Sequence, residues 1–296
     1  MKYIYKVEKI FLVNFNETEI QIMKFIRFAP EGEYKKLCMG ALAEKDLVSE
    51  DGAFYGILNE NGDAELLYGN YIDGVEKTGV TVPAESFRFL PPALPGKILA
   101  VGLNYYDHIK EFGDRPVPTY PTLFMKMTQN MIGHNDAIIK HKGTNMVHYE
   151  GEMALLISKD CANVSEEEAL DCIFGCTCLN DVTARDIQRA DGQWIRGKNL
   201  PTFCPVGPCI VNDVDYGNLK IQTRINGKIV QNGTTADMIF PPAKLISMIS
   251  EYIPLQKGDL ITTGTPVGVS SLERGDVIEI ELENVGILRN IFVDNN

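Results

Sequence analysis

The sequence lacks the signatures of several large classes of protein. It has no apolar run long enough to cross a membrane, no signal-peptide pattern and no internal repeat. The nucleotide-binding patterns G-x-x-x-x-G-K-[ST] and G-x-G-x-x-G are both absent. Positive charge is scarce, because 28 lysines and arginines stand against 40 aspartates and glutamates, for a formal net charge of −12. This acidic balance argues against nucleic acid and anionic membranes as partners.

The cysteines form neither a zinc-binding nor a disulfide pattern. There are seven of them, an odd number, and none has the C-x-x-C spacing of a zinc ribbon. We therefore expect free, mostly buried thiols and a reducing cytoplasmic location. What the chain does have is an ordinary globular composition, with 45% hydrophobic residues among 296, which suits one large domain or two.

Proline and glycine mark a domain boundary at Pro91–Gly96. Before it, short apolar runs alternate with the turn signals APEG, SEDG, NENGD and YIDG, which predicts antiparallel strands and a small β domain over residues 23–95. Residues 1–22 look detached from this domain. We expect them to be a poorly ordered extension, and the biological start could be Met23. The candidate chemistry all lies in residues 96–296.

The stretch Val147–Ile157 places two carboxylates at the entrance of a buried strand. Met153–Ile157 is apolar on both strand faces, and Glu150 and Glu152 share one face because they are two residues apart. By contrast, the glutamates of Val277–Glu283 lie opposite a cleanly apolar face and can be solvated. Paired carboxylates beside a buried strand are unfavourable without a positive partner. A solvated strand end is one interpretation; a site for a hard cation is the one that we favour.

A short helix is predicted between Asn104 and Gly113. Asn104 is a good N-cap, Gly113 can end the helix, and His108 and Glu111 fall on one face. A His-x-x-Glu pair is often only a surface contact. The functional alternative is a dyad in which Glu111 orients His108 as a general base.

Several further polar residues follow or interrupt apolar strands. Lys126 lies in the apolar run Pro121–Met127, so it either extends toward water or pairs with buried anions such as the two glutamates. Asp181 follows a strand and precedes Arg185 and Gln188, which suits a third oxygen ligand with substrate-binding neighbours. An Asn-Asp pair also opens many ordinary turns, so this motif alone is weak.

Two loops complete the candidate set. Trp194–Gly207 is rich in glycine and proline, contains the only tryptophan, and carries Lys198. Gly264–Gly268, with Thr265, offers backbone N–H groups and a hydroxyl to an anion. Between these loops, Ile225–Ile229 has the Asn-Gly pair of a type I′ hairpin.

Together these motifs resemble the fumarylacetoacetate hydrolase family. The matching stretches run in order from about residue 97 to 293: VGLNYYDHIKE, YEGEMALLI, NDVTARDIQ, GKNLPTFCPVGP, NGKIVQ and ITTGTPVGV. The resemblance implies a mainly β (α+β) fold, a mixed β-sheet roll with a small N-terminal β domain, and a homodimer. One departure is Pro201, where many relatives have an aspartate; it affects the expected distal contacts and leaves the metal set intact.

The resemblance also assigns roles by motif position. The metal ligands are Glu150, Glu152 and Asp181, and the cation is Mg²⁺, with Mn²⁺ or Ca²⁺ as alternatives. The catalytic residues are His108, Glu111 and Lys198, and Gln188 and Thr265 bind the substrate. From their own positions in the sequence, we add Lys126 and Arg185 to the expected substrate-binding residues. The helix that carries His108 lies between Gly102 and Gly113, and we expect it to act as a lid.

The expected activity is divalent-metal-dependent hydrolysis of acylpyruvates or related 1,3-diketo acids, with C–C cleavage through a metal-stabilised enolate. The same residues suit a 2-hydroxyhepta-2,4-diene-1,7-dioate isomerase or an oxaloacetate-type decarboxylase. The partner in each case is a small 2-oxo or diketo acid. A non-enzyme alternative is a β-rich binding protein with a structural Ca²⁺, whose protein oxygens would fill the coordination shell.

Overall fold

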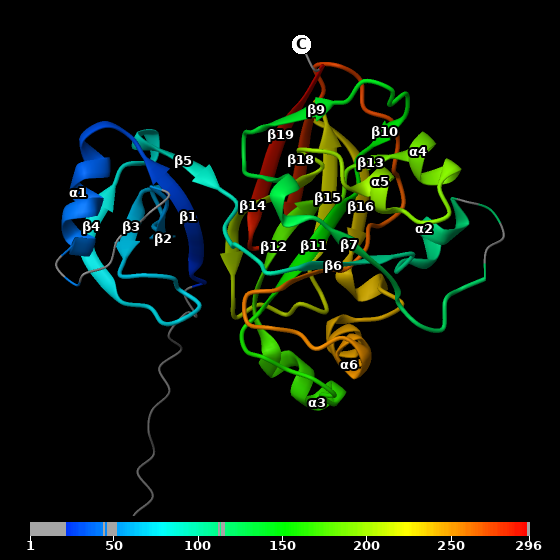
Figure 1. Cartoon of the computed structure of the whole chain (residues 1–296), viewed down its shortest axis with the longest axis horizontal. Helices are drawn as coiled ribbons and strands as arrows, with labels where there is room; N and C mark the ends of the chain where they lie inside the picture. Colours follow the sequence, from blue (N-terminus) through cyan, green and yellow to red (C-terminus); the bar gives the residue numbers. More distant parts are fainter. Residues whose placement is uncertain (1–21, 44, 46–51, 112, 114–115, 295–296) are drawn as a thin grey trace, which may run out of the picture.

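The computed structural model describes residues 22–43, 45, 52–111, 113 and 116–294 (Figure 1). The predicted extension over residues 1–22 lies outside this part of the chain except for Ile22. The structure is mainly β, with mixed sheets and few helices, as the sequence predicted. Within the described ranges, no helix combines the length and the apolar character needed to cross a membrane.

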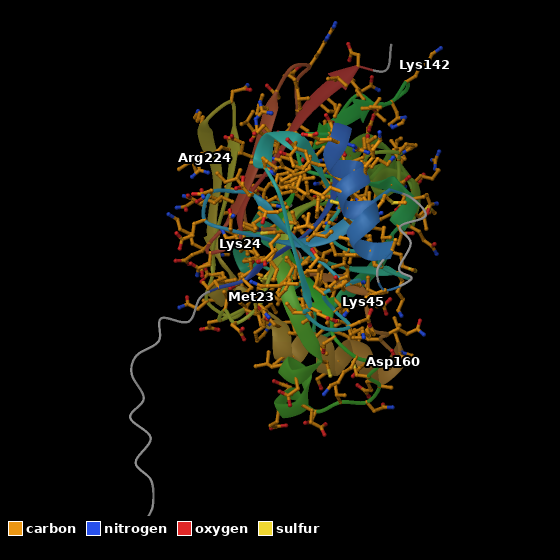
Figure 2. All side chains as sticks on the ribbon, turned by 90° about the vertical axis from the view of Figure 1, so that its left-hand side faces the viewer. Met23, Lys24, Lys45, Lys142, Asp160 and Arg224 are labelled. Atoms are coloured by element: carbon orange, nitrogen blue, oxygen red, sulfur yellow. The ribbon has the colours of Figure 1, made fainter. Side chains whose placement is uncertain are left out.

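The N-terminal part is a set of antiparallel strands with one helix. Its elements are β1 (Lys24–Pro30), α1 (Gly32–Ala43), β2 (Phe54–Leu58), β3 (Ala64–Leu67), β4 (Lys77–Val82) and β5 (Phe87–Leu90). The predicted strands are present, but we did not predict α1 from the sequence. Only Cys38 and Leu42 of this helix are buried, so its sequence shows little of the apolar periodicity that predicts a helix. Figure 2, which faces these strands, places Met23 and Lys24 where the chain enters β1.

One large sheet joins this part to the rest of the chain. Its order is β4-β3-β2-β1-β14-β12-β11-β17-β6-β7, with β5 beside β1 and β8 beside β14. Beyond the N-terminal strands, this sheet contains β6 (Ile98–Gly102), β7 (Thr122–Lys126), β8 (Met131–Ile132), β11 (Gly151–Ile157), β12 (Ile173–Asn180), β14 (Cys204–Val211) and β17 (Leu260–Thr262). Lys24 and Phe25 of β1 pair with Val211 and Ile210 of β14. Because this sheet is continuous across residue 95, the boundary between two domains there stays a prediction.

A second, five-stranded sheet packs on the first. Its order is β16 (Lys228–Thr234), β15 (Lys220–Ile225), β18 (Val277–Leu282), β19 (Gly286–Asp294) and β9 (Ala137–Lys140). The predicted hairpin is confirmed, because β15 and β16 pair antiparallel and Asn226 and Gly227 have φ of 52° and 79°.

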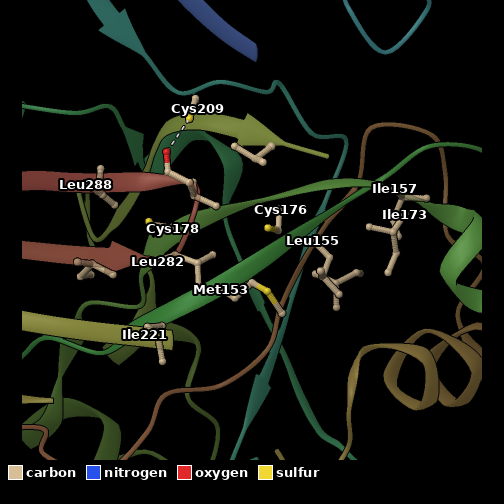
Figure 3. Close-up of a cluster of buried hydrophobic side chains, with 14 of the residues drawn as sticks. Met153, Leu155, Ile157, Ile173, Cys176, Cys178, Cys209, Ile221, Leu282 and Leu288 are labelled. Atoms are coloured by element: carbon tan, nitrogen blue, oxygen red, sulfur yellow. Dashed lines mark hydrogen bonds between the residues drawn. The ribbon is translucent and has the colours of Figure 1, made fainter. Parts of the chain in front are cut away.

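The main core lies between the two sheets (Figure 3). Met153 and Leu155 of β11 point into it, together with Ile221, Leu282 and Leu288 of the smaller sheet. The alternate residues of β11, Ala154 and Leu156, belong to a separate buried cluster on the other face. The strand is thus buried on both faces, as its apolar pattern predicted.

Short helices and one small ladder lie around the two ends of β11. They are α2 (Tyr106–Lys110), α3 (Glu166–Ala169), α4 (Arg185–Ala190), α5 (Ile195–Lys198) and α6 (Pro242–Tyr252), and the ladder of β10 (Val147–His148) with β13 (Thr183–Ala184). Of these, α3 and α6 lie near the C-terminal end of β11. In Figure 1, α2, α4 and α5 lie on the side of the molecule away from the N-terminal strands, whereas α3 and α6 lie at its base.

Candidate active site

Three buried carboxylates meet where β11 begins and β12 ends. One carboxylate oxygen from each of Glu150, Glu152 and Asp181 lies within 4.8 Å of the others. Antiparallel pairing places Gly151 opposite Asn180, and the Asp181 N–H donates to the Glu150 carbonyl at 2.9 Å. The structure therefore brings together the residues that the sequence proposed as metal ligands, although they come from separate strands.

The glycine between the two glutamates is required by close packing. A Cβ at Gly151 would lie 2.2 Å from Thr223 Oγ1 in the second sheet. The Gly151 N–H donates to Gln231 Oε1 at 3.0 Å, and its carbonyl accepts from Thr265 Oγ1 at 2.9 Å. Gln231 Nε2 then donates to Thr265 Oγ1 and to the Pro266 carbonyl, each at 2.8 Å. This buried network fixes the carboxylate-bearing strand from behind.

Buried cations balance part of the negative charge. Lys198 Nζ donates to Glu150 at 2.6 Å and to Asp181 at 2.5 Å, and Arg185 donates to Glu150. Lys126 Nζ donates to Asp181 and to the Phe203 carbonyl, each at 2.7 Å. The expectation that Lys126 pairs with a buried anion is met by Asp181. Its substrate-binding role stays a prediction, because these contacts already occupy its ammonium group.

The two glutamates have opposite electrostatic surroundings. Burial acts to raise the pKa of Glu150, but the charges of Lys198 and Arg185 hold that pKa well below its usual range. For Glu152, burial and the adjacent Asp181 and Glu150 carboxylates all raise the pKa well above its ordinary value. Burial alone would lower the pKa of Lys198, yet Asp181 and Glu150 raise it, so this lysine remains an ammonium ion.

This donor set fits a hard divalent cation. All three ligands are buried carboxylates, and Glu152 is repelled by the other two. Mg²⁺, Mn²⁺ and Ca²⁺ prefer oxygen donors, and such a charge would remove the repulsion. The Gly264 N–H donates to Glu152 Oε2 at 3.0 Å and holds this carboxylate in place.

The predicted dyad is formed on α2. His108 Nδ1 lies 2.7 Å from Glu111 Oε2, and the Gly268 N–H donates to Glu111 Oε1 at 2.8 Å. The loop predicted to bind an anion thus binds two of the protein's own carboxylates, through Gly264 and Gly268. His108 is buried, whereas Glu111 is partly exposed.

The start of this helix differs from the prediction. The N-cap of α2 is Tyr105, not Asn104. The Asn104 amide group donates to the carbonyls of Phe240 and Thr263 at 3.1 and 2.8 Å, and its oxygen accepts from the Phe240 N–H at 2.8 Å. These long-range partners satisfy a fully buried amide better than a cap on a short helix would.

One cavity of about 270 Å³ connects these groups to solvent. Of the predicted site residues, five line it: His108, Glu150, Arg185, Gln188 and Lys198. Arg185 donates to Gln188 at 2.6 Å, so these two helix residues form a pair in its wall. The remaining predicted residues surround this lining through the contacts described above: Glu111 behind His108, Glu152 and Asp181 beside Glu150, and Lys126 and Thr265 one contact farther out.

Sequence reasoning missed other residues of this region. Arg189, Asp191 and Trp194 also line the cavity. The Trp194 ring packs against Phe124 with centroids 5.3 Å apart, and a Cβ at Gly102 would lie 2.6 Å from it. Gln231 was missed as well, although its motif, NGKIVQ, was noted. The sequence signal was a polar residue at a strand position that alternation predicts to be buried.

Comparison with known proteins defines the class. Residues 97–293 match the family described as fumarylacetoacetate (FAA) hydrolase C-terminal. Because this match covers most of the chain, the protein belongs to the fumarylacetoacetate hydrolase family, and it is an enzyme. The structural-metal binding protein considered above is therefore excluded as a description of the whole chain.

Individual relatives carry several activities. A 2,4-didehydro-3-deoxy-L-rhamnonate hydrolase of Sphingomonas sp. is 36% identical over 282 residues, covering 90% of this chain and 95% of the relative. An oxaloacetate tautomerase of Bacillus subtilis is 39% identical over 213 residues, covering 68% and 71%. The crystal structure of a 2-hydroxyhepta-2,4-diene-1,7-dioate isomerase from Mycobacterium marinum matches with a TM-score of 0.79 and 34% identity, covering 93% of this chain and 99% of that one.

Proposed function

We propose that the protein is a divalent-metal-dependent hydrolase of acylpyruvate-type 1,3-diketo acids. The observation that carries this proposal is that one cavity is lined both by Glu150 of the carboxylate trio and by His108 of the His108–Glu111 pair. Charge-stabilising groups and a general base are what C–C hydrolysis of such acids needs together.

Glu150, Glu152 and Asp181 would hold the cation, with Mg²⁺ as the first choice and Mn²⁺ or Ca²⁺ as alternatives. When bound, such an ion supplies Lewis acidity that polarises a carbonyl group and stabilises negative charge on its oxygen. Arg185 and Gln188, in the cavity wall, would position the acid end of the substrate. Lys198, which stays an ammonium ion, would stabilise the developing oxyanion.

His108 would supply the proton transfers. Its Nδ1 is engaged by Glu111, so the other ring nitrogen, Nε2, would take a proton from water. The water oxygen adds to the C4 carbonyl carbon, the C3–C4 bond breaks, and its electron pair passes to the enolate of the pyruvate product. His108 then returns the proton to C3. Water supplies the new carboxylic acid, so the step needs no further reactant.

A second candidate is tautomerisation, isomerisation or decarboxylation of a 2-oxo dicarboxylic acid. The tautomerase and isomerase among the relatives favour it. The same residues would serve, because moving a proton between C3 and the 2-oxygen also needs a base at His108 and an oxyanion partner at Lys198. In decarboxylation the C3–C4 bond breaks with release of CO₂, its electron pair forms the enolate that Lys198 would stabilise, and His108 would supply the proton to C3. None of these reactions needs attack by water, which separates them from hydrolysis.

A turnover screen would test both candidates. Metal-stripped protein would be assayed with and without Mg²⁺ or Mn²⁺ on acetylpyruvate, fumarylpyruvate, oxaloacetate and 2-hydroxyhepta-2,4-diene-1,7-dioate, with separation of products. We expect metal-dependent release of pyruvate from an acylpyruvate, lost in Glu150→Ala and His108→Ala. Conversion of oxaloacetate or the dienedioate alone would replace the hydrolase with the second candidate. Absence of turnover on all four would overturn both.

We further propose a cytoplasmic homodimer. The described cysteines are free and buried, which suits a reducing compartment, and the family resemblance supports the dimer. Light scattering coupled to size-exclusion chromatography would report a mass near twice that of the chain; a monomer mass would refute the dimer.

A further inference from the structure

One arginine in the cavity wall differs from the other cations there. Lys198 and Arg185 both line the cavity and both donate to buried carboxylates. Arg189 also lines it, but among the described residues no carboxylate forms an ion pair with this guanidinium group. Its Nη1 donates to Met146 Sδ at 3.8 Å. The cavity therefore presents one positive charge that the protein itself does not neutralise.

The acidic residue in the same wall, Asp191, does not neutralise Arg189. Asp191 lines the cavity, but its carboxylate accepts two hydrogen bonds from Arg196, at 2.8 and 2.5 Å. This bidentate pair already neutralises Asp191. An anionic ligand would thus meet Arg189 without displacing a carboxylate.

The helix places this charge at a useful distance from the carboxylate trio. Arg185 begins α4 and donates to Glu150, so the start of the helix lies beside the trio. Arg189 is four residues later, about one turn or roughly 6 Å along the helix axis, and on the same face. A ligand whose head group lies at the trio would reach Arg189 with its other end.

We infer that the substrate is a 2-oxo dicarboxylic acid and that Arg189 binds its second carboxylate. This inference rests on the proposed function, because it assumes that the 2-oxo acid head lies at the trio. It adds the chemistry of the distal end. Within the proposed reactions it favours fumarylpyruvate, oxaloacetate or the dienedioate over acetylpyruvate, whose distal end is a methyl ketone.

The test compares two ligands that share the head group and differ only at the far end. The probes are 2-oxoglutarate and 2-oxopentanoate, which have the same number of carbons but end in a carboxylate or a methyl group. Binding to the full Mg²⁺-loaded protein would be measured by calorimetry for the wild type, Arg189→Gln and Arg189→Lys. Arg88→Gln, which removes an exposed arginine from β5, is the matched control.

We expect the wild type to bind 2-oxoglutarate about two- to fivefold more tightly than 2-oxopentanoate, because Arg189 is exposed and an exposed ion pair contributes about this much. Arg189→Gln should lose this preference without changing the affinity for 2-oxopentanoate. Arg189→Lys should keep part of the preference, and the control Arg88→Gln should keep all of it. Equal binding of both probes by the wild type, or an unchanged preference in Arg189→Gln, would overturn the inference and leave the proposed function standing. If neither probe binds, the head-group assignment fails and the inference falls with it.

Discussion

The carboxylate of Glu111 joins two distant parts of the chain, because it accepts the Gly268 N–H at 2.8 Å while its other oxygen lies 2.7 Å from His108 Nδ1. Helix α2 is thereby fastened to the loop that follows β17. The position of His108 depends on this loop as well as on its own helix, so the predicted lid has a defined point of attachment.

Substitution of Glu111 should separate attachment from catalysis. In Glu111→Ala both contacts are lost, and we expect turnover to fall by about 10²-fold or more, with faster hydrogen exchange over residues 104–111. Glu111→Gln keeps an oxygen that can accept the Gly268 N–H but loses the charge that orients His108. It should retain slow exchange while turnover still falls. Equal exchange in the alanine variant and the wild type would show that the contact does not hold the helix.

Removing the charge of Glu152 should have opposite effects on the two forms of the protein. Glu152 is repelled by Asp181 and Glu150, so Glu152→Gln should raise the melting temperature of the metal-free protein, by about 2–4 °C for each kcal/mol gained. The same variant should lose the rise in melting temperature that Mg²⁺ gives the wild type. Calorimetric melting with and without Mg²⁺ measures both. Glu279→Gln, on the solvated face of β18, is the control and should change neither; a metal-free Glu152→Gln protein less stable than the wild type would contradict the repulsion.

Gln231 should affect Mg²⁺ affinity only by holding in place the strand that carries the proposed ligands. It contacts Gly151 and Thr265 and none of the proposed ligands directly. Because partners behind the ligands tune affinity, Gln231→Leu should weaken Mg²⁺ binding by about 10–100-fold. Gln222→Leu removes another buried glutamine of the same sheet, which bonds to Asn232 instead, and should leave affinity unchanged. If both variants lower the melting temperature but neither alters the Mg²⁺ dissociation constant, the role of Gln231 is only structural.

The pH dependence of stability should include a contribution from His134. Burial and then the nearby Arg289 lower the pKa of this imidazole, whose Nδ1 accepts the Arg289 N–H at 3.2 Å. Because the folded-state pKa lies below the unfolded value of about 6.5, the unfolded state binds more protons as pH falls. The wild type should therefore lose stability from about pH 6.5 down to the lowered pKa. Urea midpoints at several pH values would show a shallower slope in His134→Asn; identical slopes would exclude this contribution.

Local pattern was sufficient for some parts of the structure and insufficient for others. The paired glutamates, the His108–Glu111 spacing and the Asn226-Gly227 hairpin depend on strand or helix periodicity, so they could be predicted directly. Asp181 comes beside the glutamates only because β11 pairs with β12. The family resemblance implied this pairing, but no single motif could predict it.

The omissions share a physical cause. Asn104 was assigned to a helix cap because its real partners, Phe240 and Thr263, are far away in sequence. Gln231 acts across the interface between two sheets, and the free charge of Arg189 is evident only when its neighbours are known. Helix α1 was missed for a local reason, since a helix with few buried residues has little amphipathic signal.

The pairing of β1 with β14 has a consequence for any shortened form of the enzyme. Lys24 and Phe25 cover the backbone of Val211 and Ile210. Without residues 1–95, that end of β14 would become an open edge strand, with N–H and C=O groups ready to pair with another molecule. A fragment of residues 96–296 would keep every proposed catalytic residue and yet be prone to aggregation. The N-terminal strands contribute no side chain to the site, but by covering β14 they keep the part of the chain that carries the site from aggregating.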